Sequence, residues 1–514
     1  MTNLSNFGLE KSPKKTREEI EGLLKKAADL IRTRVDYKYI LLLLFLKRLS
    51  DQWKYEYKNY YEALLKKGLS EEEAKEEAKN KVYHDFDYPE GFFWDNIRKD
   101  VSKLPEKLSE VLKKIGELNP ELRGVVDRLD FIEFTGNREN LEILRQLVEL
   151  FGDMNLAVVS PDVLGDAYEW VLKYFAPQKA KEGEVYTPRE VIKLLIEILD
   201  PKPLESVYDP ASGSGGMLIQ AYKHVEEQFG EEEVKKLFLY GQEVNQTTYA
   251  LCEMNMIIHD IRDANIQVGD TLLYPKFKEG ERLRQSDIVV ANPPWNQDGY
   301  GEEVLKKAEF YKDRYKYGFA PNNSADWIWI QHMLASATDE NGRVGIVIDN
   351  GVLFRGGKEK TIRSRILQND LVECVILLSE KLFYNTGAPG AIIILNKNKT
   401  MDRKGKVLFI NASNEYEQHP EVRKLNRLGE VHIKKIADVY REFKDSDGFS
   451  RVVSLNEIKE NDNNLNVTPY VFPIGEVEKI DIAKEWEELG GIEEGIKNLD
   501  EKISDYFEEL KYEK

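Results

Sequence analysis

The stretch that most limits how this chain can fold is Asp287–Trp295, a short apolar run that ends in two prolines. Its β-branched residues are typical of a buried strand. Pro293 and Pro294 lack the N–H group that a sheet needs and fix the backbone φ angle, so the strand must end there in a turn. We therefore expect the Asn292 amide, the Pro293 carbonyl and the Trp295 ring at the carboxyl end of a strand, where ligands of open α/β sheets usually bind.

Two hydrogen-bond acceptors beside a flat apolar ring suit a planar aromatic group that carries an exocyclic NH2. Such an amine is a poor nucleophile because its lone pair is delocalised into the ring. Accepting both of its hydrogens frees that lone pair through positioning and electrostatics. A plain strand-ending turn, with Asn292 as a local cap and Trp295 in the core, fits the same residues.

Composition sets the broad class of the protein. The chain has 514 residues, of which 41% are hydrophobic and 32% charged, and this length allows two or three domains. The longest apolar run, Tyr39–Leu46, is too short to cross a bilayer, and the first fifteen residues do not resemble a signal peptide. Cys252 and Cys374 are expected to be free thiols in a reducing cytoplasm. The six scattered histidines predict no zinc site.

The net charge of −18 argues against a surface that grips nucleic acid over a large area. A role on nucleic acid therefore requires either a local basic patch or a partner that supplies most of the phosphate contacts.

The chain divides into three parts by its patterning. Residues 1–155 are predicted to form a helical N-terminal domain, in which Ser70 and Glu73 make a capping box. Residues 156–400 are assigned to an α/β domain, and residues 401–514 to an extension that ends in a helix with heptad spacing. N-terminal helices are expected at Arg17–Arg32, Tyr39–Trp53 and Asn140–Phe151.

Strands and helices alternate beyond Pro203, which predicts a mostly parallel sheet. Only residues 379–390 separate the last two strands, so we expect these strands to form an antiparallel hairpin at one edge. Ahead of the sheet, Thr187 is predicted as the N-cap of a helix at Glu190–Leu199, with Pro188 in its first position. The seven strand candidates are Ser206–Tyr208, Leu237–Gly241, Ile266–Val268, Asp287–Ala291, Val344–Ile348, Val372–Leu378 and Ala391–Leu395.

The first strand continues into a glycine turn, Asp209–Leu218, and then a helix at Met217–Gln228. This order is typical of backbone that approaches a nucleotide-like ligand closely. It is a poor dinucleotide fingerprint, because Leu218 stands at the third glycine position and Asp209 would lie beside the ligand. A carboxylate there repels a pyrophosphate but suits a cation, such as the amino group of a methionine moiety.

Two later strand ends also carry an acid. Glu243 could accept from both hydroxyls of a ribose, and Asp270 could accept from the amino group of an adenine. Together with Asp209 and Asn292 they form an ordered set at four strand ends, which is more specific than any single member.

The motifs DPASGSGG, GQEVN, GDTL and NPPW, in this order, resemble those of amino-directed DNA methyltransferases that use S-adenosylmethionine. With LLLLFLKRLSD, LGDAYEW, TPRE and the leucine-spaced tail, the chain more closely resembles the modification subunit of type I restriction–modification systems. The resemblance covers nearly the whole chain. It implies a seven-stranded, Rossmann-like methyltransferase sheet flanked by the helical domain and the helical tail.

The resemblance also implies roles for single residues. Thr187 would lie near the methionine carboxylate, and Asp209 would hold the methionine end. Trp295 would stack on a flipped adenine, with Phe383 as a second stacking face or as a plain core aromatic. Ser214 departs from the Thr that such motifs often carry. The implied cofactor site comprises Tyr186, Thr187, Pro188, Asp209, Ser212, Gly213, Gly215, Glu243, Asp270 and Thr271, and the implied catalytic group comprises Asn292, Pro293, Pro294 and Trp295.

The partners that the resemblance implies account for the negative net charge of the chain, because they would supply most of the contacts to DNA. In type I systems a separate specificity subunit reads the duplex DNA, and two modification subunits clasp the DNA around it. The C-terminal helix and the N-terminal domain would dock that subunit, and a restriction (translocase) subunit would be able to join. Alternatives left open are a tail that packs on the chain itself, a stand-alone methylase of RNA or protein glutamine, and a non-catalytic scaffold.

Overall fold

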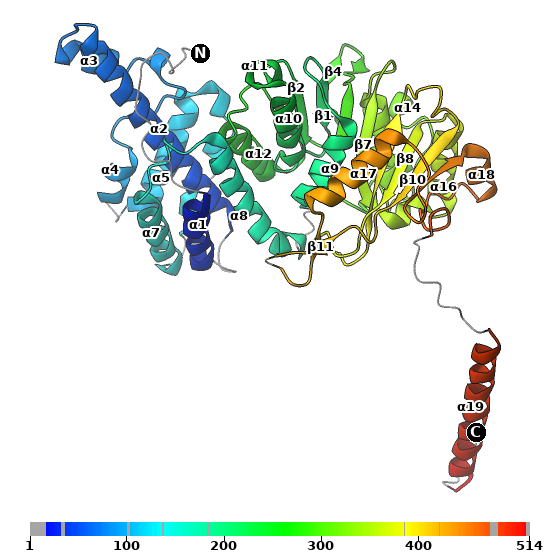
Figure 1. The fold of residues 1–514 in the computed structure, drawn as a ribbon. Helices are drawn as coiled ribbons and strands as arrows, with labels where there is room; N and C mark the ends of the chain where they lie inside the picture. Colours follow the sequence, from blue (N-terminus) through cyan, green and yellow to red (C-terminus); the bar gives the residue numbers. More distant parts are fainter. Residues whose placement is uncertain are drawn as a thin grey trace.

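The structure is a computed structural model that describes residues 17–31, 36–99, 103–128, 130–135, 138–181, 186–384, 386–420, 422–472 and 482–509. A helical N-terminal region, a mixed α/β region and a C-terminal helix follow one another along the chain (Figure 1). None of the described helices combines the length and the apolar character that a membrane span requires.

The N-terminal region is helical, as predicted. Its longest helix, α2, buries residues 40–46 completely, which accounts for the uninterrupted leucine run in the sequence. The predicted capping box is confirmed, because Ser70 Oγ accepts from Glu73 N and the Glu73 carboxylate accepts from Ser70 N. The helices are α1 (Arg17–Ile31), α2 (Lys38–Lys66), α3 (Glu71–Glu77), α4 (Trp94–Lys99), α5 (Leu104–Leu118), α6 (Phe131–Phe134) and α7 (Arg138–Gly152).

The polar end of the leucine run ties α2 to the turn that leads into the α/β region. Lys47 Nζ lies 2.5 Å from the Asp51 carboxylate, and both side chains are buried. Asp51 also accepts from the backbone N–H of Leu156 at 2.8 Å. The Arg48 guanidinium donates to the carbonyl of Val159 at 3.2 Å. Arg48 and Asp51 therefore fix the turn before α8 (Pro161–Lys181), and Lys47 holds Asp51.

Within the described ranges the central sheet has nine strands rather than the seven predicted, in the order β13-β10-β8-β9-β7-β6-β1-β2-β3. All seven predicted strands are present. The predicted antiparallel pairing of β8 with β9 is confirmed, but its position at the edge is wrong, because β9 pairs with β7 as well and β10 and β13 continue the sheet beyond β8. The strands are β1 (Ser206–Asp209), β2 (Phe238–Glu243), β3 (Asn265–Val268), β6 (Ile288–Ala291), β7 (Arg343–Asp349), β8 (Val372–Leu377), β9 (Gly390–Asn396), β10 (Lys406–Asn411) and β13 (Ser450–Ser454).

Helices cover both faces of this sheet because its strands are apolar on both sides. In β6, for example, Ile288 and Val290 face α9, α10, α12 and α17, whereas Val289 and Ala291 face α15, α16 and α18. The helices are α8 (Pro161–Lys181), α9 (Arg189–Leu199), α10 (Gly216–Phe229), α11 (Glu231–Val234), α12 (Gln246–Ile258), α13 (Glu302–Leu305), α14 (Tyr311–Arg314), α15 (Asp326–Ser336), α16 (Gly357–Gln368), α17 (Glu430–Glu442) and α18 (Leu455–Glu460). Two small ribbons lie outside the sheet: β4 (Lys278–Glu279) with β5 (Arg282–Leu283), and β11 (Glu417–Gln418) with β12 (Asn426–Arg427).

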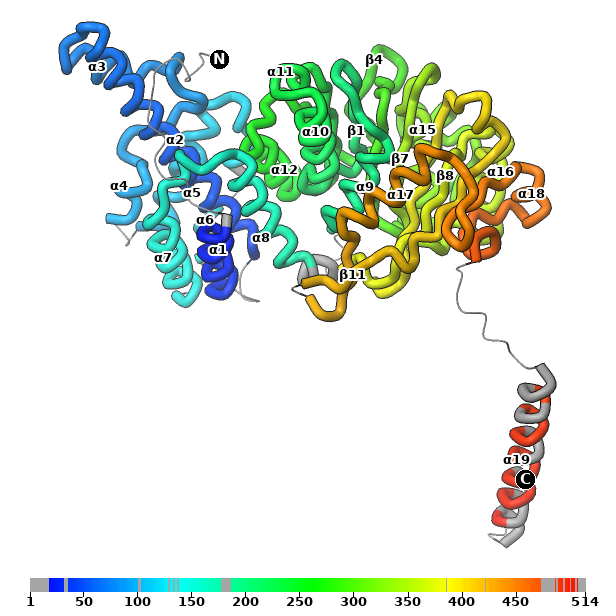
Figure 2. The backbone as a smooth tube through the Cα atoms, viewed as in Figure 1, coloured from blue at the N-terminus to red at the C-terminus, as the bar shows by residue number. Residues whose placement is uncertain are grey.

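The N-terminal helices and the α/β region share one apolar core. Leu251, Met254 and Ile258 of α12 belong to the same buried cluster as the apolar residues of α2 and α8. The Tyr168 hydroxyl on α8 donates to the carbonyl of Leu251 at 3.0 Å. Figure 2 shows α8 and α12 at the junction between the two regions.

The C-terminal helix α19 (Ile482–Glu509) stands apart from the rest of the described chain (Figure 1). It runs without interruption through Gly490 and Gly491. Its heptad-spaced apolar side chains are exposed, at Ile492, Ile496, Leu499, Ile503 and Tyr506. Leu510, the last heptad position of the prediction, lies outside the described residues.

We predict that Asp51→Ala destabilises the N-terminal region by about 3–5 kcal/mol, because it leaves Lys47 buried without its counter-ion. Burial already lowers the pKa of Lys47 and raises that of Asp51, so each charge depends on the other. Urea unfolding followed by circular dichroism measures the effect.

The matched control is Asp95→Ala. It breaks the Lys54–Asp95 pair, in which the two side chains are 37% and 65% exposed, and should cost less than about 1 kcal/mol. Equal losses in the two variants would contradict the assignment of Lys47 and Asp51 as a buried clamp.

Candidate active site at the carboxyl edge of the sheet

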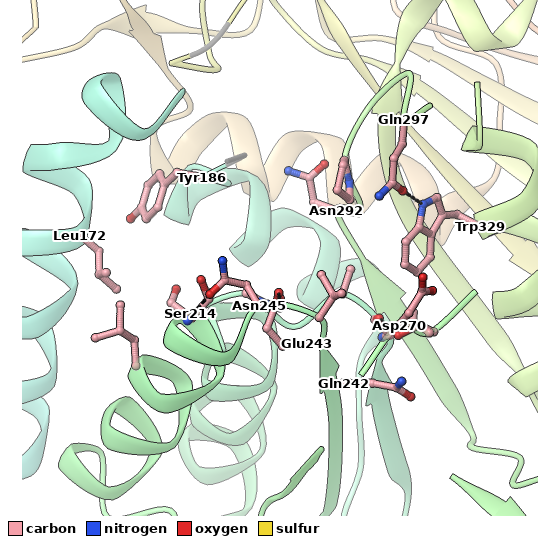
Figure 3. Close-up of a pocket in the computed structure, with 18 of the residues that line it drawn as sticks. Leu172, Tyr186, Ser214, Gln242, Glu243, Asn245, Asp270, Asn292, Gln297 and Trp329 are labelled. Atoms are coloured by element: carbon pink, nitrogen blue, oxygen red, sulfur yellow. Dashed lines mark hydrogen bonds between the residues drawn. The ribbon is translucent and has the colours of Figure 1, made fainter. Parts of the chain in front are cut away.

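Four adjacent strands bring the predicted polar residues to one edge of the sheet. Strands β3, β2, β1 and β6 are parallel neighbours, so their carboxyl ends lie on the same side. Asp209 and Glu243 are the last residues of β1 and β2, Asp270 follows β3, and Asn292 follows β6. These ends surround a cavity of about 300 Å³, in which Glu243, Asp270 and Asn292 are lining residues (Figure 3).

A second cavity, of about 70 Å³, adjoins the first and is lined by Asp209, Thr187 and Ser212. Tyr186, Gly213 and Asn292 border both cavities. Thr271 and Pro294 line the larger one. Pro188, Gly215, Pro293, Trp295 and Phe383 are outside both linings.

The glycine turn between β1 and α10 packs closely against α12. Gly215 has a φ of +86°, and a Cβ at this position would lie 2.6 Å from Met256 Cε and 2.9 Å from Cys252 Sγ. Only glycine fits both the backbone conformation and this space. Cys252 and Cys374 are buried free thiols, as predicted.

Asp209 is a buried carboxylate, 1% exposed, for which the described residues provide a backbone hydrogen bond but no ion pair. Burial raises its pKa to about 8, and the nearby Glu243 adds to the rise. A buried carboxylate of this kind is stabilised in its charged form by a bound cation. The side chain therefore fits a ligand that presents an ammonium group to the smaller cavity.

Glu243 and Asp270 are each held by backbone N–H groups. The two oxygens of Glu243 accept from Gly213 N at 3.0 Å and Asn245 N at 2.8 Å, which links the end of β2 to the glycine turn. Asp270 accepts from Leu273 N at 3.1 Å and from the Tyr300 hydroxyl at 2.9 Å. Both carboxylates keep lone pairs that a ligand in the larger cavity can use.

Asn292 is 8% exposed, and both ends of its side-chain amide are bonded. The indole Nε1 of Trp295 donates to Asn292 Oδ1 at 2.9 Å. Asn292 Nδ2 donates to Thr187 Oγ1 at 2.7 Å. The prediction that Thr187 caps the following helix is wrong, because α9 begins at Arg189, Pro188 holds the cap position and no described side chain caps the helix.

The ring of Trp295 packs on the ring of Phe383, with centroids 4.9 Å apart and an edge-on geometry. Phe383 is 1% exposed, so most of its surface contacts protein. A Cβ at Gly390 would lie 2.5 Å from Phe383 and 3.1 Å from Trp295, which explains the glycine at the start of β9. These contacts hold the indole against Asn292.

Several lining residues are absent from the sequence-based prediction. Tyr300, Gln297 and Trp329 line the larger cavity, and Trp329 Nε1 donates to Gln297 Oε1 at 3.0 Å. Tyr37, which precedes α2, and Leu172 on α8 line it from the helical side. No local pattern marks these residues, because separate parts of the chain bring them to the cavity.

Two family models together match most of this chain. The N-6 DNA Methylase family matches residues 159–479, more than half of the chain, and the HsdM N-terminal domain matches residues 20–151. This chain belongs to the N-6 DNA methylase family. The predicted kinship with type I modification subunits is confirmed by the relatives that follow.

The relatives of this N-6 DNA methylase include type I methylase subunits that match most of its length. The type I restriction enzyme MjaVII methylase subunit of Methanocaldococcus jannaschii is 47% identical over 97% of this chain and 85% of its own. The MpnII methylase subunit of Mycoplasma pneumoniae is 33% identical over 80% of this chain and 72% of its own.

Among solved structures, this N-6 DNA methylase is similar to the type I restriction–modification methyltransferase subunit from Streptococcus thermophilus. The TM-score is 0.76 at 27% identity, over 89% of this chain and all of the other. A modification subunit of a putative type I restriction enzyme from Vibrio vulnificus has the same fold, with a TM-score of 0.61 at 18% identity over 87% of this chain and 94% of the other.

Proposed function

We propose that this chain transfers a methyl group from S-adenosylmethionine to the N6 amino group of a flipped adenine in duplex DNA. It would act as the modification subunit of a type I restriction–modification complex, directed by a separate specificity subunit. The observation that carries the proposal is the place of Asn292, which borders both cavities and keeps its side-chain oxygen in a defined orientation.

The residues of the two cavities fit the proposed cofactor. Asp209, a buried carboxylate with no ion pair among the described residues, would hold the ammonium of the methionine moiety. Glu243 would accept from the ribose hydroxyls, and Asp270 would accept from the adenine amino group. Tyr186, Thr187, Pro188, Ser212, Gly213, Gly215 and Thr271 complete the proposed cofactor site. When bound, S-adenosylmethionine supplies an electrophilic methyl group.

The proposed role of Asn292 and Pro293 is to activate the target amine. Asn292 Oδ1 and the Pro293 carbonyl would accept the two hydrogens of the amine and free its lone pair, in a site where positioning and fixed dipoles lower the barrier. The target adenine must leave the duplex to reach this edge, because a stacked base cannot meet the donor. Pro294 and Trp295 would face the flipped base, with Phe383 behind Trp295 or as a second stacking face.

The net charge of −18 supports a complex in which partners make most of the phosphate contacts. We propose a specificity subunit and a second copy of this chain around duplex DNA, with room for a restriction (translocase) subunit. A DNA substrate and two free thiols favour the cytoplasm as the compartment.

The exposed face of α19 supports a docking role for this helix. Its apolar side chains repeat at the spacing of a coiled coil, and Ile492, Ile496 and Leu499 are 60%, 55% and 59% exposed. An apolar stripe of this length is stabilised when a second helix covers it. We propose that the specificity subunit provides that helix, with further contacts to the N-terminal region.

We predict that Asn292→Ala abolishes methyl transfer to DNA by the complex with the specificity subunit, while the affinity for S-adenosylhomocysteine stays within about twofold. The substitution removes an acceptor of the target amine but leaves the carboxylates of the cofactor site. Tritiated methyl transfer and mass spectrometry of the nucleosides measure the product. Asn323→Ala, on the exposed loop before α15, is the control and should retain full activity.

Methyl transfer by Asn292→Ala at near the wild-type rate would exclude the acceptor role. Label found in RNA or in protein glutamine instead of N6-methyladenine would assign the chain a different substrate.

We predict that affinity for S-adenosylhomocysteine, which carries the same amino-acid moiety, rises with pH up to about 8. The pKa of Asp209 is about 8 when no cation is bound, and ammonium binding favours the ionised form. Below pH 8 the carboxyl group must lose a proton on binding, so affinity should fall by about tenfold per pH unit. Calorimetry between pH 6.5 and 8.5 tests this, and an unchanged slope in Asp209→Asn would assign the pH dependence to another group.

We predict that truncation after Gly475 prevents co-purification of the specificity subunit but preserves cofactor binding. Ile496→Glu combined with Ile503→Glu should have the same effect, because it places charges on the apolar stripe. The matched control, Lys497→Gln with Asn498→Glu, makes the same change in net charge on the opposite face of α19 and should leave co-purification intact. Undiminished co-purification of the truncated chain would show that docking occurs elsewhere.

A further inference from the structure

The side chain of Asn292 is held by two segments that are far apart in the sequence. Thr187 lies just before α9 and accepts from Asn292 Nδ2 at 2.7 Å. Trp295 lies three residues after Asn292 and donates to its Oδ1 at 2.9 Å. An amide that is bonded at both ends, and that is 8% exposed, has little freedom to rotate.

Thr187 and Trp295 place different constraints on the orientation of the Asn292 amide. A threonine hydroxyl can donate or accept, so Thr187 alone would tolerate either orientation of the amide. An indole N–H can only donate, so Trp295 requires the oxygen of Asn292 on its side. With the oxygen fixed there, Nδ2 must face Thr187, and the hydroxyl acts as the acceptor.

The local sequence leaves the Thr187 hydroxyl available for this contact. The residue before a helix usually turns its side chain back to cap the first N–H groups. Here Pro188 occupies the cap position, and no side chain in the described part of the chain makes a cap bond to α9. The hydroxyl of Thr187 points to Asn292 instead.

The Trp295 indole is held in place by the packing around it. Phe383 packs edge-on against the Trp295 ring, and a side chain at Gly390 would collide with Phe383. Trp295 therefore cannot turn away from Asn292 without a change in the buried packing around β9.

We propose that Thr187 is a positioning residue for methyl transfer, which with the Trp295 N–H orients the Asn292 amide so that its oxygen faces the target amine. The carbonyl oxygen of Asn292 has two lone pairs. Trp295 uses one of them, and the other remains for one hydrogen of the amine. This inference rests on the proposed function and gives Thr187 a role on the acceptor side of the site, besides its place in the proposed cofactor site.

The decisive comparison is Thr187→Val against Thr187→Ser. Valine keeps the branched shape but removes the acceptor, whereas serine keeps the hydroxyl. In the complex with the specificity subunit we expect kcat of the valine variant to fall by about tenfold, the usual effect of one lost hydrogen bond. The Kd for S-adenosylhomocysteine should rise by much less than kcat falls, and the serine variant should recover most of kcat.

A second readout does not depend on catalysis. In the ¹⁵N–¹H spectrum of the full-length protein labelled at tryptophan, the Trp295 indole resonance is assigned by its loss in Trp295→Phe. We expect this resonance to shift or broaden in Thr187→Val, because the amide then loses one of its two hydrogen-bond partners and its oxygen can move relative to the indole N–H. The resonance should keep its position in Thr187→Ser.

The proposal is overturned if Thr187→Val leaves both kcat and the indole resonance unchanged. It is also overturned if the variant weakens cofactor binding in proportion to kcat while the resonance stays fixed, since Thr187 would then serve the cofactor and not Asn292. If the wild-type complex transfers no methyl group to adenine, the proposed function fails, and the indole resonance alone still decides whether Thr187 orients Asn292.

Discussion

Parallel pairing of β3, β2, β1 and β6 is the constraint on which the site depends. These strands are covered by helices on both faces, so polar side chains with a chemical role are confined to the strand ends. The register then sets their spacing. Asp209 pairs with Gly241, which places Glu243 two residues beyond the end of β1, where its carboxylate meets the N–H of Gly213. One ladder of hydrogen bonds thus brings together the glycine turn, the acids and Asn292.

The parts that could be predicted from the sequence are those with a local signature. A glycine turn after a strand, an acid at a strand end and a strand broken by two prolines each involve a few adjacent residues. All seven predicted strands occur in the structure for this reason. The capping box at Ser70 is another local pattern, and its two hydrogen bonds form as expected.

The errors arose where distant parts of the chain decide the outcome. The hairpin of β8 and β9 was expected at an edge, yet β9 lies between β7 and β8 and is buried on both faces. Its uninterrupted run Ala391–Leu395 carries that signal, because a strand at an exposed edge usually includes polar residues. The neighbours of Thr187 predict a helix cap, but its hydroxyl bonds to Asn292, 105 residues away. Tyr37 and Trp329 reach the cavity in the same non-local way.

The position of the cavity at the junction has a thermodynamic consequence. Tyr37 and Leu172 line it from the helical side, and strand ends line it from the other. A ligand that contacts both sides adds its binding free energy to the cohesion between them, since it is lost when either side unfolds. A ligand that occupies this cavity therefore makes the denaturation of the two regions more nearly a single cooperative event, because it links them across their junction.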